Sequence, residues 1–495
     1  MDPRTPVIVG VGQITNRRAR IAHVLDMLEE VSHAANADAG GHVLDRIDAV
    51  QEVSQISWRS PAPASLLAQR LGIEPRERTV STVGGSTPQS LVNLACDRIV
   101  AGEINGVLIA GCEAFDSVRR ATKEGASDDR GRSDDLPPDQ TMGDDRSPVC
   151  PEELAARLVA PASIYPMFEQ ALAHRDGRTP DEQRVWLGEL MAPFTKVAAS
   201  HPDLSWFPTE RTAKELSEIS DDNRMVAEPY TKNLNAILQV DMAAAIIVMS
   251  MEAAGAAGVP KDQWIFPWAG AKCDDVWFLA QRPNFDRSVA LEAVGAAVFP
   301  AAGIGVDDVT HIDLYSCFPS AVQMSADALG IPLDDRRGLT LTGGLPYFGG
   351  PGNNYVTHSI STLVSKLRDT YGDETGLVTG ISWYCTKMAM GLYGASPPPN
   401  GWRHPDMKED QERIDATALD VVAEAEGVAT VDGFTVEHDK DFGPLRAPLY
   451  AKLEDGRRVV AVPADADIPK QLSGRSIIGE RVKIQTGEGS PVYEL

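Results

Sequence analysis

One pattern recurs in two distant parts of the chain and restricts the possible folds more than any other feature. In the first part, the β-prone residues 79–83 run into Gly84 and Gly85, which break the strand. Residues 86–100 then place apolar side chains at helical spacing, and residues 107–110 form a short apolar run. This order predicts a strand, a glycine turn, a helix and a buried strand.

The second copy of the pattern begins with a predicted strand at residues 339–342, followed by the glycine-rich stretch 343–352. A helix is predicted near residues 357–368 and an apolar strand at residues 376–381. Because parallel strands are joined through covering helices, the two copies predict an α/β fold built from two βαβ halves.

Further apolar runs extend each half. Residues 5–12 read as a first central strand ending in glycine, and residues 47–53 read as another strand before the repeat begins. We expect the second half to open with residues 243–249 and to continue with residues 265–269 and 313–315.

A long insertion separates the halves at residues 116–230. It is polar and acidic at residues 128–145 and then helical, with anchoring side chains at Trp186, Met191 and Phe194. An unstructured loop of this length is improbable in a compact domain, so the insertion is expected to be a subdomain over the sheet ends. The length of 495 residues agrees with a chain of about two to four domains.

The character of the sequence changes after residue 394. Residues 396–401 have the composition of a linker. Short β-prone runs separated by Asp-Gly turns follow, and they predict a small closed barrel of the oligonucleotide/oligosaccharide-binding type. Residues 407–495 contain 18 Asp and Glu against 11 Lys and Arg, so this segment has a net negative charge. A groove that binds the phosphates of a nucleic acid is positively charged, so nucleic acid is not an expected partner.

The overall composition excludes several other classes. A net charge of −25 repels polyanions at long range, although a nucleotide-like ligand needs only a local basic pocket. The longest apolar stretches, residues 242–251 and 291–306, are shorter than the roughly 20 residues of a membrane helix. The first residues lack the pattern of a secretory signal, and we expect a cytoplasmic protein. The cysteines show neither disulfide nor zinc spacing; they are Cys96, Cys112, Cys150, Cys273, Cys317 and Cys385.

Six motifs in a fixed order identify a resemblance to the thiolase superfamily, close to the sterol-carrier-protein-linked thiolases. They are VIVGVGQ at 7–13, GGSTPQSLVN at 84–93, VLIAGCEA at 107–114, LYSCFPSA at 314–321, GGLPYFGGPGNN at 343–354 and GISWYCTK at 380–387. A single glycine-rich motif is a weak signal, whereas six in order with the internal repeat are a strong one. With the appended barrel, the chain resembles the type 1 thiolase-like proteins, which carry an additional C-terminal domain.

The resemblance implies a five-layered αβαβα body made of two similar βαβαβαββ halves, with an inserted loop domain that holds coenzyme A. It divides the chain into an N-terminal half at residues 1–115 that part of residues 231–255 completes, a loop domain at 116–230, a C-terminal half at 231–395, a linker at 396–406 and a β-barrel domain at 407–495. Catalysis in this superfamily takes place where the two halves meet.

The resemblance also implies an acyltransferase of the acetyl-CoA acetyltransferase class, but the reactive side chains differ. Thr82 stands at the position of the nucleophilic cysteine, and a hydroxyl is a far poorer nucleophile than a thiolate. Gly350 replaces the histidine of the Gly-His-Pro motif, and Tyr315 takes the first position of the Asn-Glu-Ala-Phe motif. The second catalytic cysteine falls near Ile381, with Trp383 in place of the following glycine. Ordinary thiolysis is therefore not expected.

Other reactive groups lie in the same motifs, and each has two readings. His358 is either a base near the reaction centre or a helix-face histidine bonded within the fold. Cys317 and Cys385 are either replacement nucleophiles or buried thiols that behave as small hydrophobic groups. An enzyme with altered chemistry would use one of these thiols together with His358.

Several further residues are predicted to contact the ligand. Lys387 either approaches a phosphate or carboxylate or ends a strand in solvent. Tyr315, Asn353 and Asn354 either donate hydrogen bonds to a thioester carbonyl or bond within the glycine-rich loop. Glycines permit tight turns that turn backbone N–H groups toward a ligand. The predicted ligand-binding set is Gly84, Gly85, Ser86, Gly343, Gly344, Gly349, Gly352, Asn353, Asn354, Trp383 and Lys387.

These observations predict a protein of lipid metabolism that binds coenzyme A or an acyl-CoA as a ligand, with no covalently bound cofactor and no metal. A non-catalytic scaffold, with the barrel as its docking surface, is the alternative. Thiolases usually dimerise through the strand before the nucleophile loop. Here residues 78–82 are polar and lack the usual residues, so a monomer is favoured slightly over a homodimer.

Overall fold

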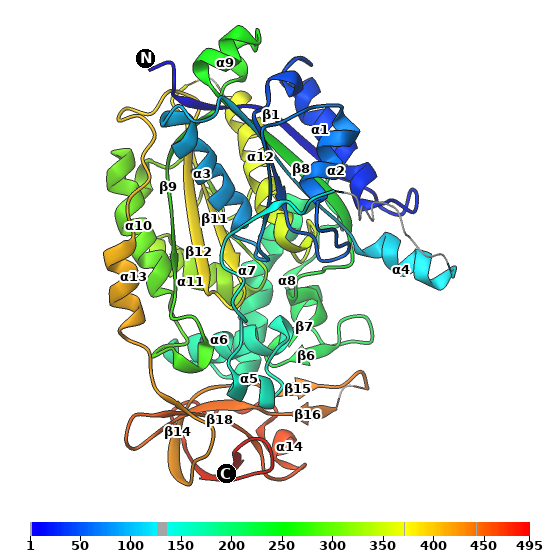
Figure 1. The fold of residues 1–495 in the computed structure, drawn as a ribbon. Helices are drawn as coiled ribbons and strands as arrows, with labels where there is room; N and C mark the ends of the chain where they lie inside the picture. Colours follow the sequence, from blue (N-terminus) through cyan, green and yellow to red (C-terminus); the bar gives the residue numbers. More distant parts are fainter. Residues whose placement is uncertain (1, 126–135, 371, 442) are drawn as a thin grey trace.

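The N-terminal sheet has six strands. The computed structural model describes residues 2–125, 136–370, 372–441 and 443–495 (Figure 1). The strand order is β1 (Pro6–Thr15), β8 (Asp241–Ser250), β4 (Gly106–Ala114), β2 (Ala49–Val53), β3 (Glu77–Ser81) and β5 (Gln140–Met142). The prediction that residues 243–249 open the second half is wrong, because β8 pairs antiparallel with both β1 and β4 and so completes the first sheet.

The second sheet has four strands, in the order β10 (His311–Asp313), β11 (Thr375–Ser382), β12 (Lys387–Gly394) and β9 (Phe266–Asp274). The strand predicted at residues 339–342 does not form. This segment instead turns around the buried Asp313 carboxylate, which accepts bonds from the Thr340 hydroxyl at 2.8 Å and from the Leu341 N–H at 3.0 Å. A buried carboxylate needs such donors, and that need overrides the β propensity of the segment.

Helices complete five layers. Helices α1 (Val24–Asp38) and α2 (Pro63–Leu71) cover the outer face of the first sheet, and α10 (Val289–Ala302) covers the outer face of the second, with α11 (Pro319–Leu329) packed on it. Helices α3 (Thr87–Val100) and α12 (Tyr355–Arg368) contact strands of both sheets and lie between them (Figure 1). The predicted αβαβα body is confirmed.

The insertion is mostly helical. Its main helices are α6 (Pro161–Arg175) and α7 (Pro180–Ser200), with shorter helices α4 (Phe115–Lys123), α5 (Pro151–Ala155) and α8 (Ala213–Ser217) and short strands β6 (Met225–Ala227) and β7 (Tyr230–Thr231). Met191 and Phe194 are buried, and Trp186 packs partly buried against the core. The predicted acidic stretch lies partly outside the described residues.

The C-terminal segment forms the predicted closed barrel. Its five strands are β18 (Arg458–Pro463), β17 (Leu449–Leu453), β14 (Gly427–Phe434), β19 (Arg481–Gln485) and β20 (Val492–Glu494), and β20 pairs with β18 to close it. Strand β13 (Val421–Val422) pairs with β18, and helix α14 (Ile468–Leu472) follows β18 in the chain. Helix α13 (Lys408–Asp415) precedes the barrel and packs on α10. The barrel has its own apolar core. A short helix of the body, α9 (Met251–Ala256), follows β8.

The barrel is joined to the inserted domain through backbone and side chains. Strands β16 (Pro444–Arg446) and β15 (Glu437–His438) extend the β6–β7 hairpin into a four-stranded sheet. The buried Glu228 carboxylate accepts hydrogen bonds from His438 Nε2 at 2.8 Å, Ser473 Oγ at 2.6 Å and the Gly474 N–H at 2.8 Å. The additional domain is therefore fixed to the body and is not a loosely tethered module. No described helix is both long enough and apolar enough to cross a membrane.

A fully buried acid in the first sheet makes stability depend on pH. The Glu52 side chain on β2 accepts a hydrogen bond from Gln55 Nε2. Burial raises the pKa of Glu52 well above its usual 4.5; the Gln55 bond opposes this and the charge of Asp139 adds to it. A group with a raised folded pKa holds its proton longer in the folded state, so its stabilising contribution is lost as pH rises above 4.5 toward the folded pKa.

We expect the Glu52→Gln substitution to remove the loss of folding stability that the Glu52 carboxyl causes as pH rises. The variant should unfold at a higher temperature than the parent at about pH 8 and at nearly the same temperature at about pH 4. Calorimetric unfolding at both pH values measures the difference. Glu488→Gln, at an exposed position, is the matched control and should change neither value. A Glu52→Gln variant that is destabilised at about pH 8 would contradict the argument.

Candidate functional site

The two halves meet at the loop after β3. The Gly84 N–H donates to Asn353 Oδ1 at 2.9 Å, and the Asn353 amide in turn donates to the Ser54 carbonyl at 2.6 Å. The Ser86 N–H donates to Ser382 Oγ at 2.9 Å, where β11 ends. The structure thus brings together Gly84, Ser86 and Asn353, residues of the first and second halves that the motifs singled out.

Gly85 is required by the close approach of the second half. A Cβ atom at this position would overlap the Tyr315 hydroxyl and the Ile381 carbonyl oxygen. The Tyr315 side chain is buried, and the Tyr315 backbone N–H donates to Thr379 Oγ1 at 2.8 Å. The loop after β3 therefore packs directly against residues of the second half.

The glycine-rich loop before α12 uses its backbone donors internally. The Gly350 N–H donates to the Ile237 carbonyl at 3.0 Å, and the Gly352 N–H donates to the Gly350 carbonyl at 2.7 Å. The N–H groups of Gly343 and Gly344 donate to the hydroxyls of Thr340 and Thr342. Gly349 has a φ of +123°, and a side chain there would overlap Met242.

His358 lies inside α12 and contacts the first sheet. Its Nδ1 is 2.9 Å from Gln13 Oε1, and the Phe348 ring packs edge-on against it. Burial lowers the pKa of His358 to about 3, so the ring is neutral at physiological pH. The neighbouring Asn354 donates to the Gly111 carbonyl at 2.6 Å. His358 thus bonds to Gln13 within the fold, and the Asn354 side-chain amide bonds to strand β4 rather than within the glycine-rich loop.

Cys317 and Cys385 form a buried cluster with Tyr165. Burial raises the pKa of both thiols, that of Cys385 to about 12, and burial also raises the pKa of Tyr165. Because the thiolate is the nucleophilic form, both thiols remain unreactive at neutral pH. The Tyr165 hydroxyl donates to the Trp383 carbonyl at 2.7 Å and fixes the adjoining turn.

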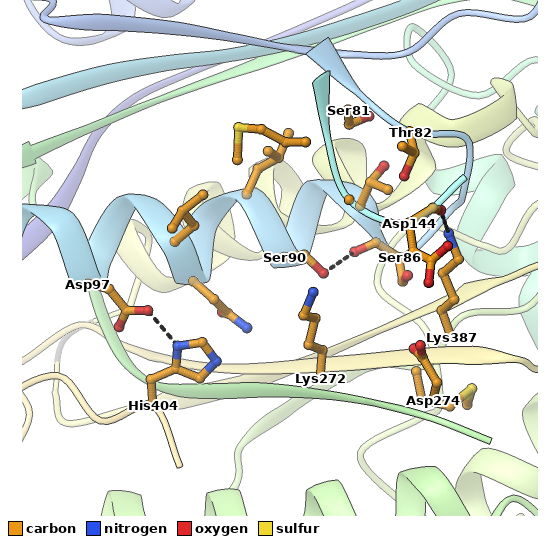
Figure 2. A pocket seen from close by; sticks show the side chains of 17 residues that line it. Ser81, Thr82, Ser86, Ser90, Asp97, Asp144, Lys272, Asp274, Lys387 and His404 are labelled. Atoms are coloured by element: carbon orange, nitrogen blue, oxygen red, sulfur yellow. Dashed lines mark hydrogen bonds and ion pairs between the residues drawn. The ribbon is translucent and has the colours of Figure 1, made fainter. Parts of the chain in front are cut away.

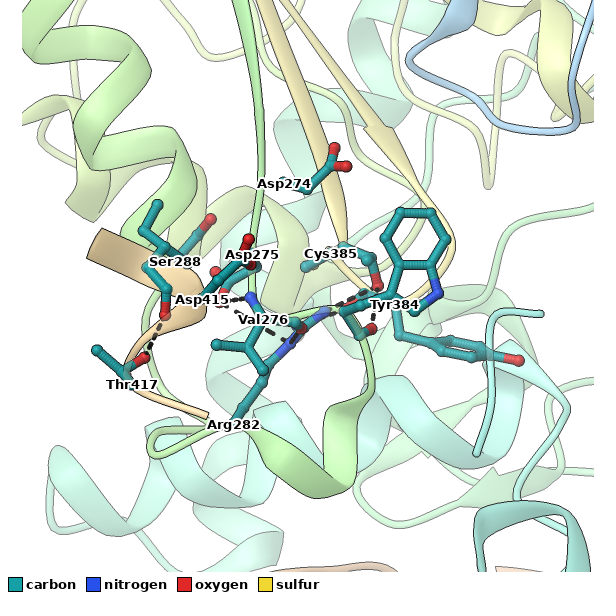
Figure 3. A network of polar contacts seen from close by, with 12 residues as sticks. Asp274, Asp275, Val276, Arg282, Ser288, Tyr384, Cys385, Asp415 and Thr417 are labelled. Carbon is teal, nitrogen blue, oxygen red and sulfur yellow. Dashed lines mark hydrogen bonds and ion pairs between the residues drawn. The ribbon is translucent and has the colours of Figure 1, made fainter. Parts of the chain in front are cut away.

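The turn between β11 and β12 is held in a strained conformation. Trp383 and Cys385 have φ values of 55° and 52°, in the left-handed region that residues other than glycine rarely adopt. Figure 3 shows the buried Arg282 beneath this turn; it donates to the Tyr384 carbonyl at 2.7 Å and to Thr386 Oγ1 at 2.8 Å. Arg282 therefore stabilises the strained turn that precedes Lys387.

A cavity of about 250 Å³ opens beside Thr82 and runs along α3 (Figure 2). The exposed Lys272 and His404 lie at its rim. Within the described part of the chain, Thr82 Oγ1 and Asn93 Nδ2 are buried and have no hydrogen-bond partner. Buried polar atoms in native proteins are almost always bonded, so these two atoms are suited to a ligand.

Three charged side chains reach the same cavity from neighbouring strands. Lys387 on β12 lies directly opposite Asp274 on β9, and Lys272 lies two residues before Asp274 on the same face. The Lys387 Nζ donates to the Asp144 carbonyl at 2.7 Å. Burial raises the pKa of Asp274 and lowers that of Lys387.

The sequence motifs led to Thr82, Ser86 and Lys387 but missed Lys272, Asp274 and Asn93. The signal in the sequence was slight: Lys272 and Asp274 alternate in a strand whose other residues are apolar, which places both on one face. Only the register between β9 and β12 shows that this face meets Lys387.

The β3 edge, by which thiolases usually dimerise, is covered in this chain. Strand β5 pairs in parallel with β3 through the residue pairs Thr79–Gln140, Val80–Thr141 and Ser81–Met142. The loop after β5 then brings Gly143 and Asp144 over Thr82 and the cavity. One inserted segment thus covers the edge and closes one wall of the site.

Comparisons with known proteins agree with this architecture. The family model of the thiolase-like protein type 1 additional C-terminal domain matches residues 410–489. The crystal structure of a monomeric SCP2-thiolase-like protein type 1 from Mycobacterium smegmatis superposes with a TM-score of 0.86 and 33% sequence identity, covering 100% of both chains. A comparison with curated proteins finds no significant match.

Two more distant structures share the fold of the body. The Ltp2–ChsH2 (DUF35) aldolase has a TM-score of 0.59 and 19% identity, and the dimeric peroxisomal thiolase of Saccharomyces cerevisiae has a TM-score of 0.56 and 14% identity. Each similarity covers 80% of this chain and 98% of the other. At such identities the similarity shows the fold alone.

Proposed function

Because this chain belongs to the type 1 thiolase-like proteins of the thiolase superfamily, we propose that it binds coenzyme A or an acyl-CoA without performing ordinary thiolysis. It belongs by descent to the acetyl-CoA acetyltransferase class, and a role in cytoplasmic lipid metabolism is part of the same proposal. The side chains that a thiolase uses for turnover are absent, whereas a cavity remains where the acyl group would enter.

The cavity beside Thr82 is the main support for ligand binding. Its volume of about 250 Å³ suits the acyl and thioester end of the ligand and excludes the nucleotide, which would remain outside. Lys272 at the rim has no ion pair within the described residues, so its charge is available to an anionic group of the ligand. Thr82 Oγ1 is free to donate to a thioester oxygen, and Asn93 Nδ2, farther along α3, is free to donate to another polar atom of the ligand.

Calorimetric titration with coenzyme A and acetyl-CoA tests binding. We expect saturable binding to the parent protein and weaker binding to Lys272→Ala, by about threefold to tenfold, because one exposed charge contributes roughly 1 kcal/mol. Lys483→Ala, which removes an exposed lysine from the barrel, should bind as the parent does. Absence of binding to the parent protein would refute the proposal and favour a scaffold.

We also propose that the protein is a monomer, because β5 occupies the β3 edge; the similarity to a monomeric relative supports this. Light scattering at micromolar concentration should give the mass of one 53.3 kDa chain. Thr141→Pro should weaken β5, expose the β3 edge and cause concentration-dependent association, whereas Thr141→Val should not. A parent protein whose mass stays dimeric at all concentrations would contradict the monomer.

A further inference from the structure

Lys387 has surroundings that differ from those of an ordinary surface lysine. Its Nζ donates to the carbonyl oxygens of Asp144 at 2.7 Å and Val83 at 3.5 Å, both neutral acceptors. No carboxylate of the described residues forms an ion pair with it within 4 Å. The strained turn held by Arg282 immediately precedes it and fixes its backbone. The amine is thus positioned by the fold without being neutralised by a salt bridge.

Cationic groups lie close to this amine. Lys387 Nζ lies 5.3 Å from the centroid of the Trp277 ring, and the Arg146 guanidinium lies 3.8 Å from the same centroid. Lys272 projects into the same cavity from β9 (Figure 2). A desolvated lysine near another cation loses its proton more easily and becomes a nucleophilic amine.

From this arrangement we propose that Lys387 forms a Schiff base with a small aldehyde or ketone bound in the cavity, with Asp274 as the proton donor. The proposal goes beyond coenzyme A binding and does not depend on it. Burial lowers the pKa of Lys387; the charges of Asp274 and Asp144 oppose this shift, and the smaller effects of Lys272 and Arg146 add to it. Burial also raises the pKa of the Asp274 carboxyl, which therefore keeps its proton to higher pH.

The reaction is a condensation with no oxidant or reductant. The lone pair of the neutral Lys387 Nζ adds to the carbonyl carbon, the carbonyl π electrons move to oxygen, and a proton passes from nitrogen to that oxygen to give a carbinolamine. The C–O bond then breaks as the Asp274 carboxyl protonates the departing hydroxyl, which leaves as water. The products are an iminium on Lys387 and a carboxylate on Asp274, on directly paired residues of β12 and β9.

The remaining polar groups define the class of carbonyl compound. Thr82 Oγ1, unpartnered and buried, adjoins Val83, whose carbonyl lies 3.5 Å from Lys387 Nζ, and it can donate a hydrogen bond to the carbonyl oxygen before water leaves. Lys272 provides a positive charge for a carboxylate on the same molecule. A cavity of about 250 Å³ admits a compound the size of several water molecules, each about 30 Å³. The fitting class is a short oxo acid or short aldehyde.

Reductive trapping tests the proposal. The full-length protein is incubated with pyruvate or acetaldehyde and cyanoborohydride, without coenzyme A, and the modified lysines are located by peptide mass spectrometry. We expect Lys387 to be modified about tenfold or more faster than exposed lysines near neutral pH, because more of its amine is unprotonated. As the pH falls, modification of Lys387 should persist below the pH at which exposed lysines stop reacting.

Variants separate chemistry from folding. Lys387→Arg keeps the charge and should lose the adduct at this position while unfolding at nearly the parent temperature. Asp274→Asn should retain the fold and form the adduct about a hundredfold more slowly, the usual effect of removing a general acid. Lys470→Arg, at an exposed lysine paired with Asp467, should leave the adduct on Lys387 unchanged.

Modification no faster at Lys387 than at exposed lysines, with both probes, would overturn the proposal. An Asp274→Asn variant that reacts at the parent rate would remove Asp274 from the mechanism and overturn its assigned role. Because the trapping assay contains no coenzyme A, its failure leaves the calorimetric test of coenzyme A binding unaffected. The two proposals therefore fail independently.

Discussion

The protein is expected to cleave acetoacetyl-CoA about 10⁴- to 10⁶-fold more slowly than an ordinary thiolase. Removing a nucleophile and its base from an interdependent set leaves only binding and carbonyl polarisation, and such losses commonly reach this size. Thr82 and Gly350 cannot supply a thiolate or an imidazole. The buried thiols of Cys317 and Cys385 stay protonated because burial raises the pKa of each, and His358 is neutral and bonded to Gln13.

A steady-state thiolysis assay with an ordinary thiolase as reference measures this loss. Thr82→Cys should fail to restore turnover, because no imidazole stands at Gly350 to activate the new thiol. Thr82→Ser is the matched control for side-chain size and should behave as the parent does. An ordinary thiolase rate from the parent protein would show that other side chains perform the reaction.

The second large effect is expected for Glu228→Ala, which should lower the free energy of unfolding by about 3–5 kcal/mol. The substitution removes a buried carboxylate that accepts three hydrogen bonds from the barrel. Each buried donor that loses its acceptor costs about 1–3 kcal/mol, so the loss of this shared acceptor is costly in this range.

Denaturant unfolding and limited proteolysis together measure this effect. The barrel of the Glu228→Ala variant should be cleaved faster than that of the parent, because its attachment to the β6–β7 hairpin is weakened. Glu218→Ala, at an exposed glutamate paired with Lys214, is the control and should change stability by less than about 1 kcal/mol. A Glu228→Ala barrel that resists proteolysis as the parent does would mean that Glu228 does not secure the domain.

The fold was predictable from the sequence where local pattern and tertiary environment agree. The β3–α3–β4 unit lies within a few residues of its predicted bounds, because a glycine turn separates a β-prone run from a helical one. The apolar pattern alone placed strand β8 in the second half, because an apolar run shows that a strand is buried and not which sheet contains it; the family resemblance placed part of residues 231–255 in the first half. Residues 339–342 do not form the predicted strand, because the Thr340 hydroxyl and the Leu341 N–H donate hydrogen bonds to the buried Asp313 carboxylate. Asp313 is distant in sequence, so the local pattern does not show this contact.

The candidate site was predictable only in part, for a related reason. Glycine motifs indicated the loop at Gly84 and Gly85, since the close approach of Tyr315 leaves no room for a side chain. The pairing of Lys387 with Asp274 depends on strand register, which is set by contacts across the sheet and not by spacing along the chain. Burial, which decides the protonation of His358, is likewise a property of the whole fold.

A crystal structure of the protein soaked with acetoacetyl-CoA distinguishes binding without turnover from catalysis. We expect an uncleaved ligand whose acyl end occupies the cavity beside Thr82, between Lys272 and Asn93, with the nucleotide outside. Partial occupancy with the thioester intact would agree with binding without turnover. Cleaved products in the cavity, or a ligand bound away from the Thr82 loop, would contradict it.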